Sequence, residues 1–275
     1  MSYYWKLVHM EIYRFRYVLV SMMGLVALVQ LGAIALYALD EVAVWQEYIR
    51  QHGMWESQPM MSFPQAMVDI QFWYTLPVLL CAAVLALYMF IIWYRDWFGG
   101  HTFMYRLLML PTARSQIYWA KLTAILVFVL SLLGFQVLLM WMEYGLFMGM
   151  VPSELVAPSY IAEGIEVNTV LNLLLPRTFE YFIYRCGLGV LMMLIVFNAI
   201  LLERSYRRLI GIGYAVGYAI VCLLVTLLPL LFKRLIRSNY LYPEEFVMLE
   251  WLACLLVAAG SAWLGNRLLK KKITV

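Results

Sequence analysis

The sequence predicts an all-α integral membrane protein with six transmembrane helices. Of its 275 residues, 65% are hydrophobic and 13% are charged, whereas about a quarter of the residues in an ordinary soluble domain are charged. The apolar residues gather in charge-free runs that reach the roughly 20 residues a helix needs to cross a bilayer. We therefore expect one transmembrane domain over residues 1–275.

The six expected spans follow these runs and are separated by polar or charged segments. They cover residues 17–39, 72–94, 122–142, 183–202, 209–232 and 247–266. The first run is longer than the roughly 7 to 15 apolar residues of a signal peptide, so we expect it to remain as a membrane helix. No acidic residue falls at the centre of a span, since Glu143, Glu180 and Glu250 fall near the outer boundary.

The distribution of Lys and Arg predicts that both termini are cytoplasmic. With this orientation, fourteen of the 20 basic residues lie inside, as the positive-inside rule requires. They are Lys6, Arg14, Arg16, Arg95, Arg106, Arg114, Lys121, Arg204, Arg207, Arg208, Arg267, Lys270, Lys271 and Lys272. The mixture of basic and aromatic residues at 1–16 predicts an N-terminal interfacial helix, although a basic flank with an aromatic belt explains the same residues.

Two long segments, residues 40–71 and 143–182, then lie on the outer side. Each carries several acidic residues. These carboxylates suit contact with a cationic ligand, and they equally suit plain solvated loops.

The polar stretch between the second and third spans, residues 95–121, is predicted to be a cytoplasmic loop with a short helix in it. Gly99 and Gly100 break the preceding helix, Thr102 is suited to cap a new one, and Pro111 stops it. Apolar residues recur at helical spacing between these signals. A short helix of this kind, lying along the membrane surface, is suited to dock into a groove on another protein.

The sequence lacks the motifs of the common enzyme classes. It has no His-Glu-x-x-His, no Gly-x-Ser-x-Gly and no phosphate-binding loop. Its four cysteines lie inside apolar runs without metal-site spacing. We therefore expect no catalytic residues, no metal site and no cofactor on this chain, and no nucleic-acid partner.

Two pairs of glycines have the small-xxx-small spacing that lets membrane helices approach closely. They are Gly145 with Gly149 and Gly213 with Gly217. We expect them to pack helices tightly, without locating a dimer interface from the pattern alone.

The loop resembles the corresponding loop of the ABC-2 type permease family. That family often has an acidic residue, Gly-Thr, Leu-x-x-Leu-Pro, Arg and Lys in this order. The matching positions here are Asp96, Gly99, Gly100, Thr102, Leu107, Leu110, Pro111, Arg114 and Lys121. An aspartate stands where glutamate is common, and His101 interrupts the Gly-Thr pair.

The resemblance implies the permease subunit of a bacterial exporter in the cytoplasmic membrane. Its partners would be separate ABC ATPase subunits, which carry the ATP and Mg²⁺, and a second permease chain, identical or different. The loop would be the coupling helix, with Phe103, Arg106, Leu107 and Leu110 on the docked face and Arg114 near the lipid phosphates. The implied cargo is hydrophobic or amphipathic, such as a peptide antibiotic or a lipid.

Two other interpretations remain open. The short helix in the loop would also suit a role that only anchors the loop at the membrane, although the docking role is the one we favour. The whole chain would also suit a non-transporting sensor or assembly protein, whose external loops bind a ligand while its inner loop contacts a partner.

Overall fold

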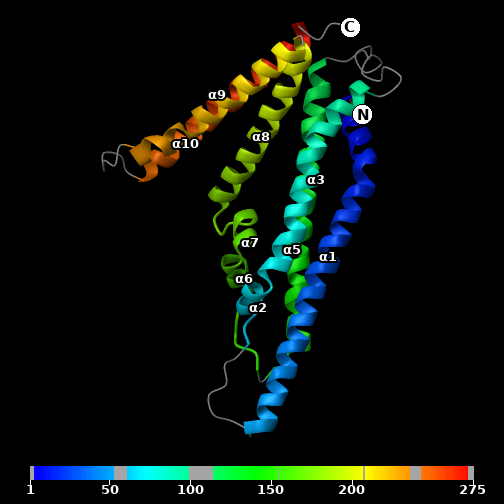
Figure 1. Ribbon diagram of the computed structural model, residues 1–275, viewed down its shortest axis with the longest axis vertical. Helices are drawn as coiled ribbons and strands as arrows, with labels where there is room; N and C mark the ends of the chain where they lie inside the picture. The colour runs from blue at the N-terminus through cyan, green and yellow to red at the C-terminus, as the bar shows by residue number, and fades with distance from the viewer. Residues whose placement is uncertain are drawn as a thin grey trace. The chain divides into compact units, whose positions relative to one another are not determined.

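The structure is a computed structural model that describes residues 3–52, 61–98, 114–153, 155–206, 208–235 and 243–271. Nearly all of these residues are helical (Figure 1). The helices are α1 Tyr3–His52, α2 Phe63–Asp69, α3 Gln71–Phe98, α5 Arg114–Met150, α6 Ile161–Val167, α7 Thr169–Leu174, α8 Phe179–Ser205, α9 Arg208–Leu235 and α10 Pro243–Lys271. The described residues form no β-strand, and an isolated parallel bridge joins Met61 to Val156.

Six of the described helices are long and apolar enough to cross a membrane, which confirms the predicted number of spans. They are α1, α3, α5, α8, α9 and α10, and each contains one predicted span. The protein is therefore a multi-pass helical membrane protein.

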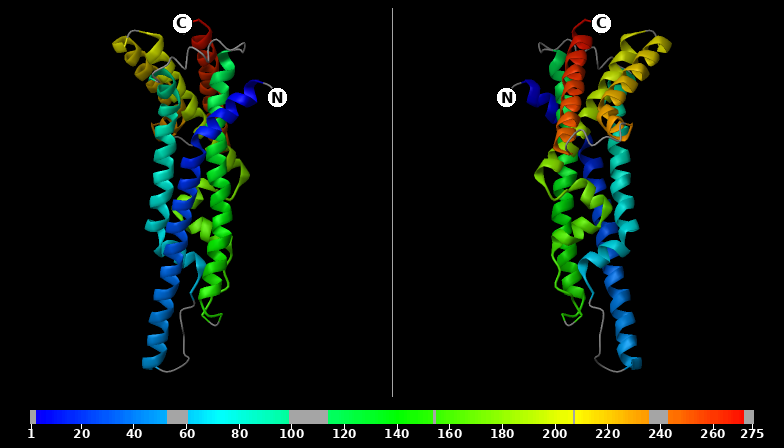
Figure 2. Two further views of the ribbon diagram at one scale, coloured as in Figure 1. Left: turned by 90° about the vertical axis from the view of Figure 1, so that its right-hand side faces the viewer. Right: turned by 90° about the vertical axis from the view of Figure 1, so that its left-hand side faces the viewer.

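Two of these helices are much longer than their predicted spans. α1 has 50 residues and α5 has 37, so α1 alone is about 75 Å long at 1.5 Å per residue. Helical structure is continuous through residues 16 and 17, so residues 3–16 form the first turns of α1, and the predicted interfacial position of these turns stays a prediction. Figure 2 shows these turns, in dark blue, beside the beginning of α5 in green. One face of them packs on protein, because Leu7 and Val8 are buried against Ile117 and Ala120 of α5.

The chain divides into two compact units, and α1, α3, α5 and α8 contribute to both. Unit 1 consists of Met1–Tyr13, Leu85–Leu126 and Ile183–Val275. Unit 2 consists of Arg14–Val84 and Val127–Phe182.

In unit 2, the two segments predicted as external loops contain regular structure. α1 and α5 extend into them, and α2, α6 and α7 form within them. Ser62 caps α2 by accepting a hydrogen bond from the Gln65 amide at 3.3 Å, and Asn168 caps α7 in the same way. α2 and α6 pack closely, since a Cβ on Gly164 would lie 2.7 Å from the Phe63 ring. Short capped helices thus build a folded region here.

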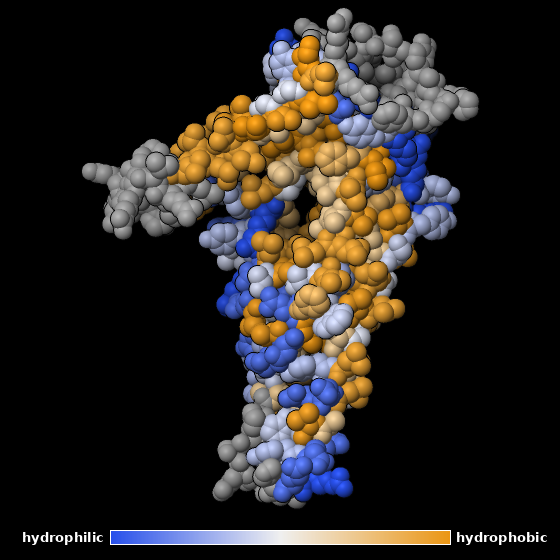
Figure 3. Space-filling model, viewed as in Figure 1, coloured by the Kyte–Doolittle hydropathy of each residue, from blue (hydrophilic) through white to orange (hydrophobic). Residues whose placement is uncertain are grey.

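In unit 1, α9 and α10 lie side by side (Figure 1). Cys222 and Val257 are buried in a small core with Leu191 and Ile195 of α8. Most of the outer surface of α9 and α10 is apolar and exposed, as Figure 3 shows for the face in view. This surface suits contact with lipid or with another membrane chain.

Candidate functional site

Four charged side chains form a buried cluster in unit 1, where α3 ends and α5 begins. Glu11 comes from the first turns of α1, Arg95 and Asp96 from the last turn of α3, and Lys121 from the second turn of α5. Glu11, Asp96 and Lys121 are at most 2% exposed. We call this set the four-charge cluster. Charged residues at such burial in a membrane protein mark a functional site by default.

Lys121 lies at the centre of the four-charge cluster. Its Nζ donates to Glu11 Oε1 at 3.1 Å, to the Ile92 carbonyl at 2.7 Å and to Asp96 Oδ2. These three acceptors use all three N–H bonds of the ammonium group. The Trp93 ring covers the group as well, with its centroid 5.3 Å from Nζ.

Glu11 joins the two basic residues of the cluster. Its second carboxylate oxygen, Oε2, accepts a hydrogen bond from Arg95 Nη2 at 2.8 Å. The cluster therefore holds two formal positive and two formal negative charges. Balanced contacts of this kind offset the several kcal/mol that each buried ion loses in hydration, and removing one partner costs about 3–5 kcal/mol.

Apolar packing joins two of the helices that supply the cluster, α1 and α5. Leu7 and Val8 pack against Ile117 and Ala120. The Tyr4 hydroxyl lies 2.6 Å from Thr123 Oγ1. The beginning of α1 is thereby held against α5, and Glu11 is presented to Lys121.

The structure brings together two residues that the sequence predicted for the coupling loop, Asp96 and Lys121. They form a direct ion pair, although 24 positions of the chain lie between them. Arg114 is the first residue of α5. The other predicted members lie outside the described residues: Gly99, Gly100, Thr102, Phe103, Arg106, Leu107, Leu110 and Pro111.

Two members of the four-charge cluster, Glu11 and Arg95, were not predicted as site residues. Arg95 was counted only as a basic residue of the inner side. Glu11 gave a usable signal, because it is one of three acidic residues on the predicted inner side, with Asp96 and Glu203. An acidic residue in a segment rich in basic residues indicates a specific ion-pair partner within the protein.

Unit 2 holds a second buried polar group, in which a glutamate is bonded to side chains without a formal charge. We call it the neutral polar network because none of the named partners of the glutamate is charged. Gln136 Nε2 donates to Gln30 Oε1 at 2.9 Å and to the Tyr74 hydroxyl at 2.5 Å. Tyr74 in turn donates to Glu143 Oε2 at 3.3 Å. All four side chains are at most 4% exposed, and Glu143 Oε1 has no partner within the described residues.

Glu143 is more deeply buried than the sequence indicated. The charge-free run ends at Met142, which places Glu143 at the predicted outer boundary of the third span. α5 continues to Met150, and Glu143 is fully buried in unit 2. A hydropathy profile shows where the first charged residue follows an apolar run. It does not show how far the surrounding protein continues to bury that residue.

The four glycines predicted to pack helices have open space beside them. A Cβ at Gly145, Gly149, Gly213 or Gly217 would meet no described atom within 4 Å. In unit 1 close approaches occur at Gly211 of α9, where a Cβ would lie 2.5 Å from the Glu203 carbonyl oxygen, and at Gly265 of α10, where a Cβ would lie 2.7 Å from Asn198 Oδ1. The prediction for the four glycines therefore stays a prediction.

The described residues offer no group of three or more His, Cys, Asp or Glu placed to hold a metal ion. Fold and site together define a multi-pass helical membrane protein with a buried ionic cluster at one end of its second and third spans. Comparison with protein-family models, with curated proteins and with solved structures found no match to this chain.

Proposed function

We propose that this chain is the permease subunit of an ABC-2 type exporter in the bacterial cytoplasmic membrane. Both termini and the loop after α3 would be cytoplasmic. The observation that carries the proposal is the buried Asp96–Lys121 ion pair. These two residues occupy the first and last positions of the motif that resembles the ABC-2 family. Their contact gives that motif a physical role, since it holds the two ends of the loop together.

This arrangement suits the transmission of force. A partner that pushes on the loop between α3 and α5 would act on two helices whose ends are tied by an ion pair and by Glu11. Because these charges are buried and balanced, their separation costs several kcal/mol. The displacement would therefore move α3, α5 and the start of α1 as one body, which is a rigid-body mode of coupling.

The proposed partners are two ABC ATPase subunits, which bind ATP and Mg²⁺, and a second permease chain. Exposed apolar residues on α9, among them Leu209, Val216 and Ile220, support a large contact with lipid or with that chain. Gly213 and Gly217 lie on the same helix with open space beside them. The cargo would be a hydrophobic or amphipathic compound.

Purification of the tagged chain from its native host in mild detergent tests this proposal. We expect a P-loop ATPase to co-purify. Leu110→Asp should weaken its association at least about tenfold, because burying a charge at the centre of an interface costs about 2 kcal/mol or more. Arg106→Glu should act in the same direction.

The matched control for these variants is Arg50→Glu, which reverses a charge whose side chain is 82% exposed near the other end of α1. It should leave ATPase recovery unchanged. Recovery of an intact chain with no ATPase, or equal association in all variants, would exclude the exporter.

The folded region of unit 2 favours a second candidate, a membrane sensor or assembly protein. α2, α6 and α7 pack together in segments that the sequence predicted as loops, and a packed region of this kind is suited to bind a ligand. Ligand-dependent binding of a partner without ATP-driven translocation would favour this candidate over the exporter.

A further inference from the structure

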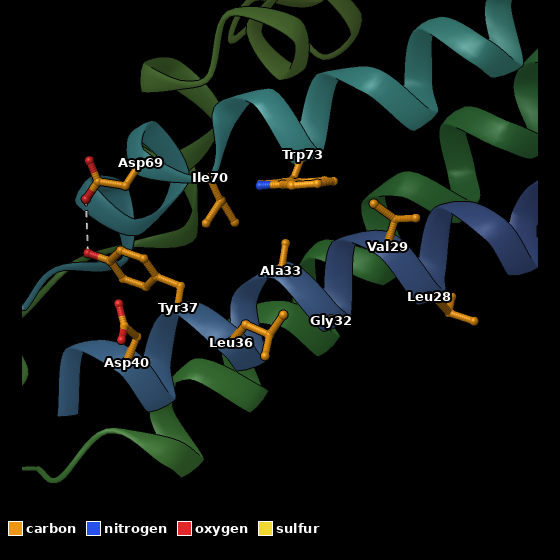
Figure 4. Close-up of a pocket in the computed structure, with 10 residues that line it drawn as sticks. All are labelled: Leu28, Val29, Gly32, Ala33, Leu36, Tyr37, Asp40, Asp69, Ile70 and Trp73. Carbon is orange, nitrogen blue, oxygen red and sulfur yellow. Dashed lines mark hydrogen bonds between the residues drawn. The ribbon is translucent and has the colours of Figure 1, made fainter. Parts of the chain in front are cut away.

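A groove runs along α1 in unit 2 and has a volume of about 670 Å³ (Figure 4). Its α1 wall is one helical face, because the lining residues recur at three- and four-residue spacing from Leu28 to Asp40. These positions span about 18 Å at 1.5 Å per residue. The facing wall comes from Asp69, Ile70 and Trp73, where α2 meets α3. The volume lies in the range of sites that enclose a small organic ligand.

Most of the groove is apolar. Small residues, Gly32 and Ala33, line its α1 wall, and a Cβ added at Gly32 would meet no described atom within 4 Å. Figure 4 shows Trp73 facing Ala33 across the groove. Leu36 and Trp73 are 70% and 57% exposed, so large apolar surfaces border the open space. An alkyl chain lying here would cover them.

One end of the groove is acidic. Asp40 and Asp69 lie there on either side of Tyr37 (Figure 4). Asp69 accepts hydrogen bonds from neutral donors, the Tyr37 hydroxyl at 3.1 Å and Gln65 Nε2 at 3.3 Å. Neither carboxylate has an ion-pair partner among the residues that the structure describes.

The basic side chains of unit 2 do not neutralise this end. Arg50 lies 3.6 Å from Glu47, and Arg177 lies 2.8 Å from Glu166. Arg14 and Arg16 lie at least 24 residues before Asp40 on α1, which is about 36 Å at 1.5 Å per residue. Two carboxylates next to an apolar channel thus leave a negative potential without a described counter-charge. That combination selects a ligand with a positive head and an apolar tail.

We propose that this groove binds a single-chain amphipathic cation. Its alkyl chain lies along Gly32 and Ala33 beside Trp73, and its ammonium group lies between Asp40 and Asp69. A phosphate-bearing lipid is disfavoured, because its phosphate would be repelled by the two carboxylates. That this cation is the exported compound rests on the proposed function, whereas its binding to the groove does not.

The test uses the full chain in phosphatidylcholine nanodiscs, with radiolabelled dodecyltrimethylammonium as the probe and empty nanodiscs as background. We expect saturable binding that unlabelled dodecyl sulfate and dodecylphosphocholine do not displace. The double variant Asp40→Asn with Asp69→Asn should weaken probe binding about tenfold or more, because it removes both charges that face the ammonium group.

Two further variants separate the groove from general effects. Gly32→Leu places a side chain in the apolar part of the groove, where its Cβ meets no described atom within 4 Å, and it should abolish saturable binding. Glu166→Gln neutralises an exposed carboxylate of the same unit outside the groove, and it should leave binding unchanged. Equal binding by the double variant, or full displacement by dodecylphosphocholine, would overturn the proposal and indicate a lipid site.

The outcome is independent of the ATPase experiment. Probe binding without a co-purifying ATPase would support the proposed ligand site and contradict the proposed exporter. A co-purifying ATPase without probe binding would support the exporter and contradict the ligand site.

Discussion

The four-charge cluster of unit 1 and the neutral polar network of unit 2 bury carboxyl groups in opposite ways. Glu11 and Asp96 each contact a basic side chain, and the formal charges of the cluster sum to zero. Among the described residues, the Tyr74 hydroxyl is the hydrogen-bond partner of Glu143 Oε2, and Glu143 Oε1 has none. Burying a polar group costs little free energy only when each of its hydrogen-bonding atoms has a partner. The charges of the four-charge cluster therefore stabilise unit 1, whereas burial of the Glu143 carboxyl does not stabilise unit 2.

The largest effect should follow from removing the central cation of the four-charge cluster. Lys121→Met leaves Glu11 and Asp96 buried without their shared ammonium group, while both still contact Arg95. We expect a loss of about 3–5 kcal/mol in the free energy of unfolding. SDS-induced unfolding in mixed micelles measures it. The exposed Lys6→Met is the matched control and should change stability by less than about 0.5 kcal/mol. Equal losses in the two variants would show that the cluster has no structural role.

The same change at two buried glutamates distinguishes the two regions directly. Glu11→Gln removes the charge that faces Lys121 and Arg95, and we expect a loss of about 2 kcal/mol. Glu143→Gln places a neutral group of the same shape among neutral partners, so its cost should stay below about 1 kcal/mol. The same unfolding assay compares them. A larger loss for Glu143→Gln would reverse our interpretation of both sites.

A smaller effect than that of Lys121→Met is expected from removing a hydroxyl inside the neutral polar network. Tyr74→Phe removes the hydroxyl that accepts from Gln136 and donates to Glu143. We expect a loss of about 1–2 kcal/mol, because two buried groups lose a partner. Tyr37→Phe removes a hydroxyl that bonds the exposed Asp69 and serves as the control. A loss no greater than that of the control would show that the network is not coupled through Tyr74.

Hydropathy was sufficient for the number of spans but not for the ends of the helices. The first run ends where Asp40 and Glu41 begin, yet α1 continues to His52, directly before Gly53 in the sequence. α5 likewise continues past Glu143 to Met150, shortly before Pro152. A charge ends a membrane-compatible run, whereas a helix ends where a residue disfavours its backbone. Pro152 was the better signal for the end of α5.

The candidate site was predicted in part. Asp96 and Lys121 were found through their places in a loop motif, but their contact with each other was not. Glu11 is 110 positions from Lys121 along the chain, and no spacing in a single sequence reveals such a contact. Periodicity reports which face of one helix is apolar. It does not report which helices meet.

The saturated ammonium group of Lys121 also constrains how this protein evolves. Its three N–H bonds are used by side chains from α1 and α3 and by a carbonyl of α3, so each of positions 11, 96 and 121 is adapted to the other two. A single substitution at any of them makes the numbers of buried positive and negative charges unequal. We expect a paired change that keeps these numbers equal to be tolerated. Among homologues, these three positions should therefore vary together, and this covariation should extend to Arg95.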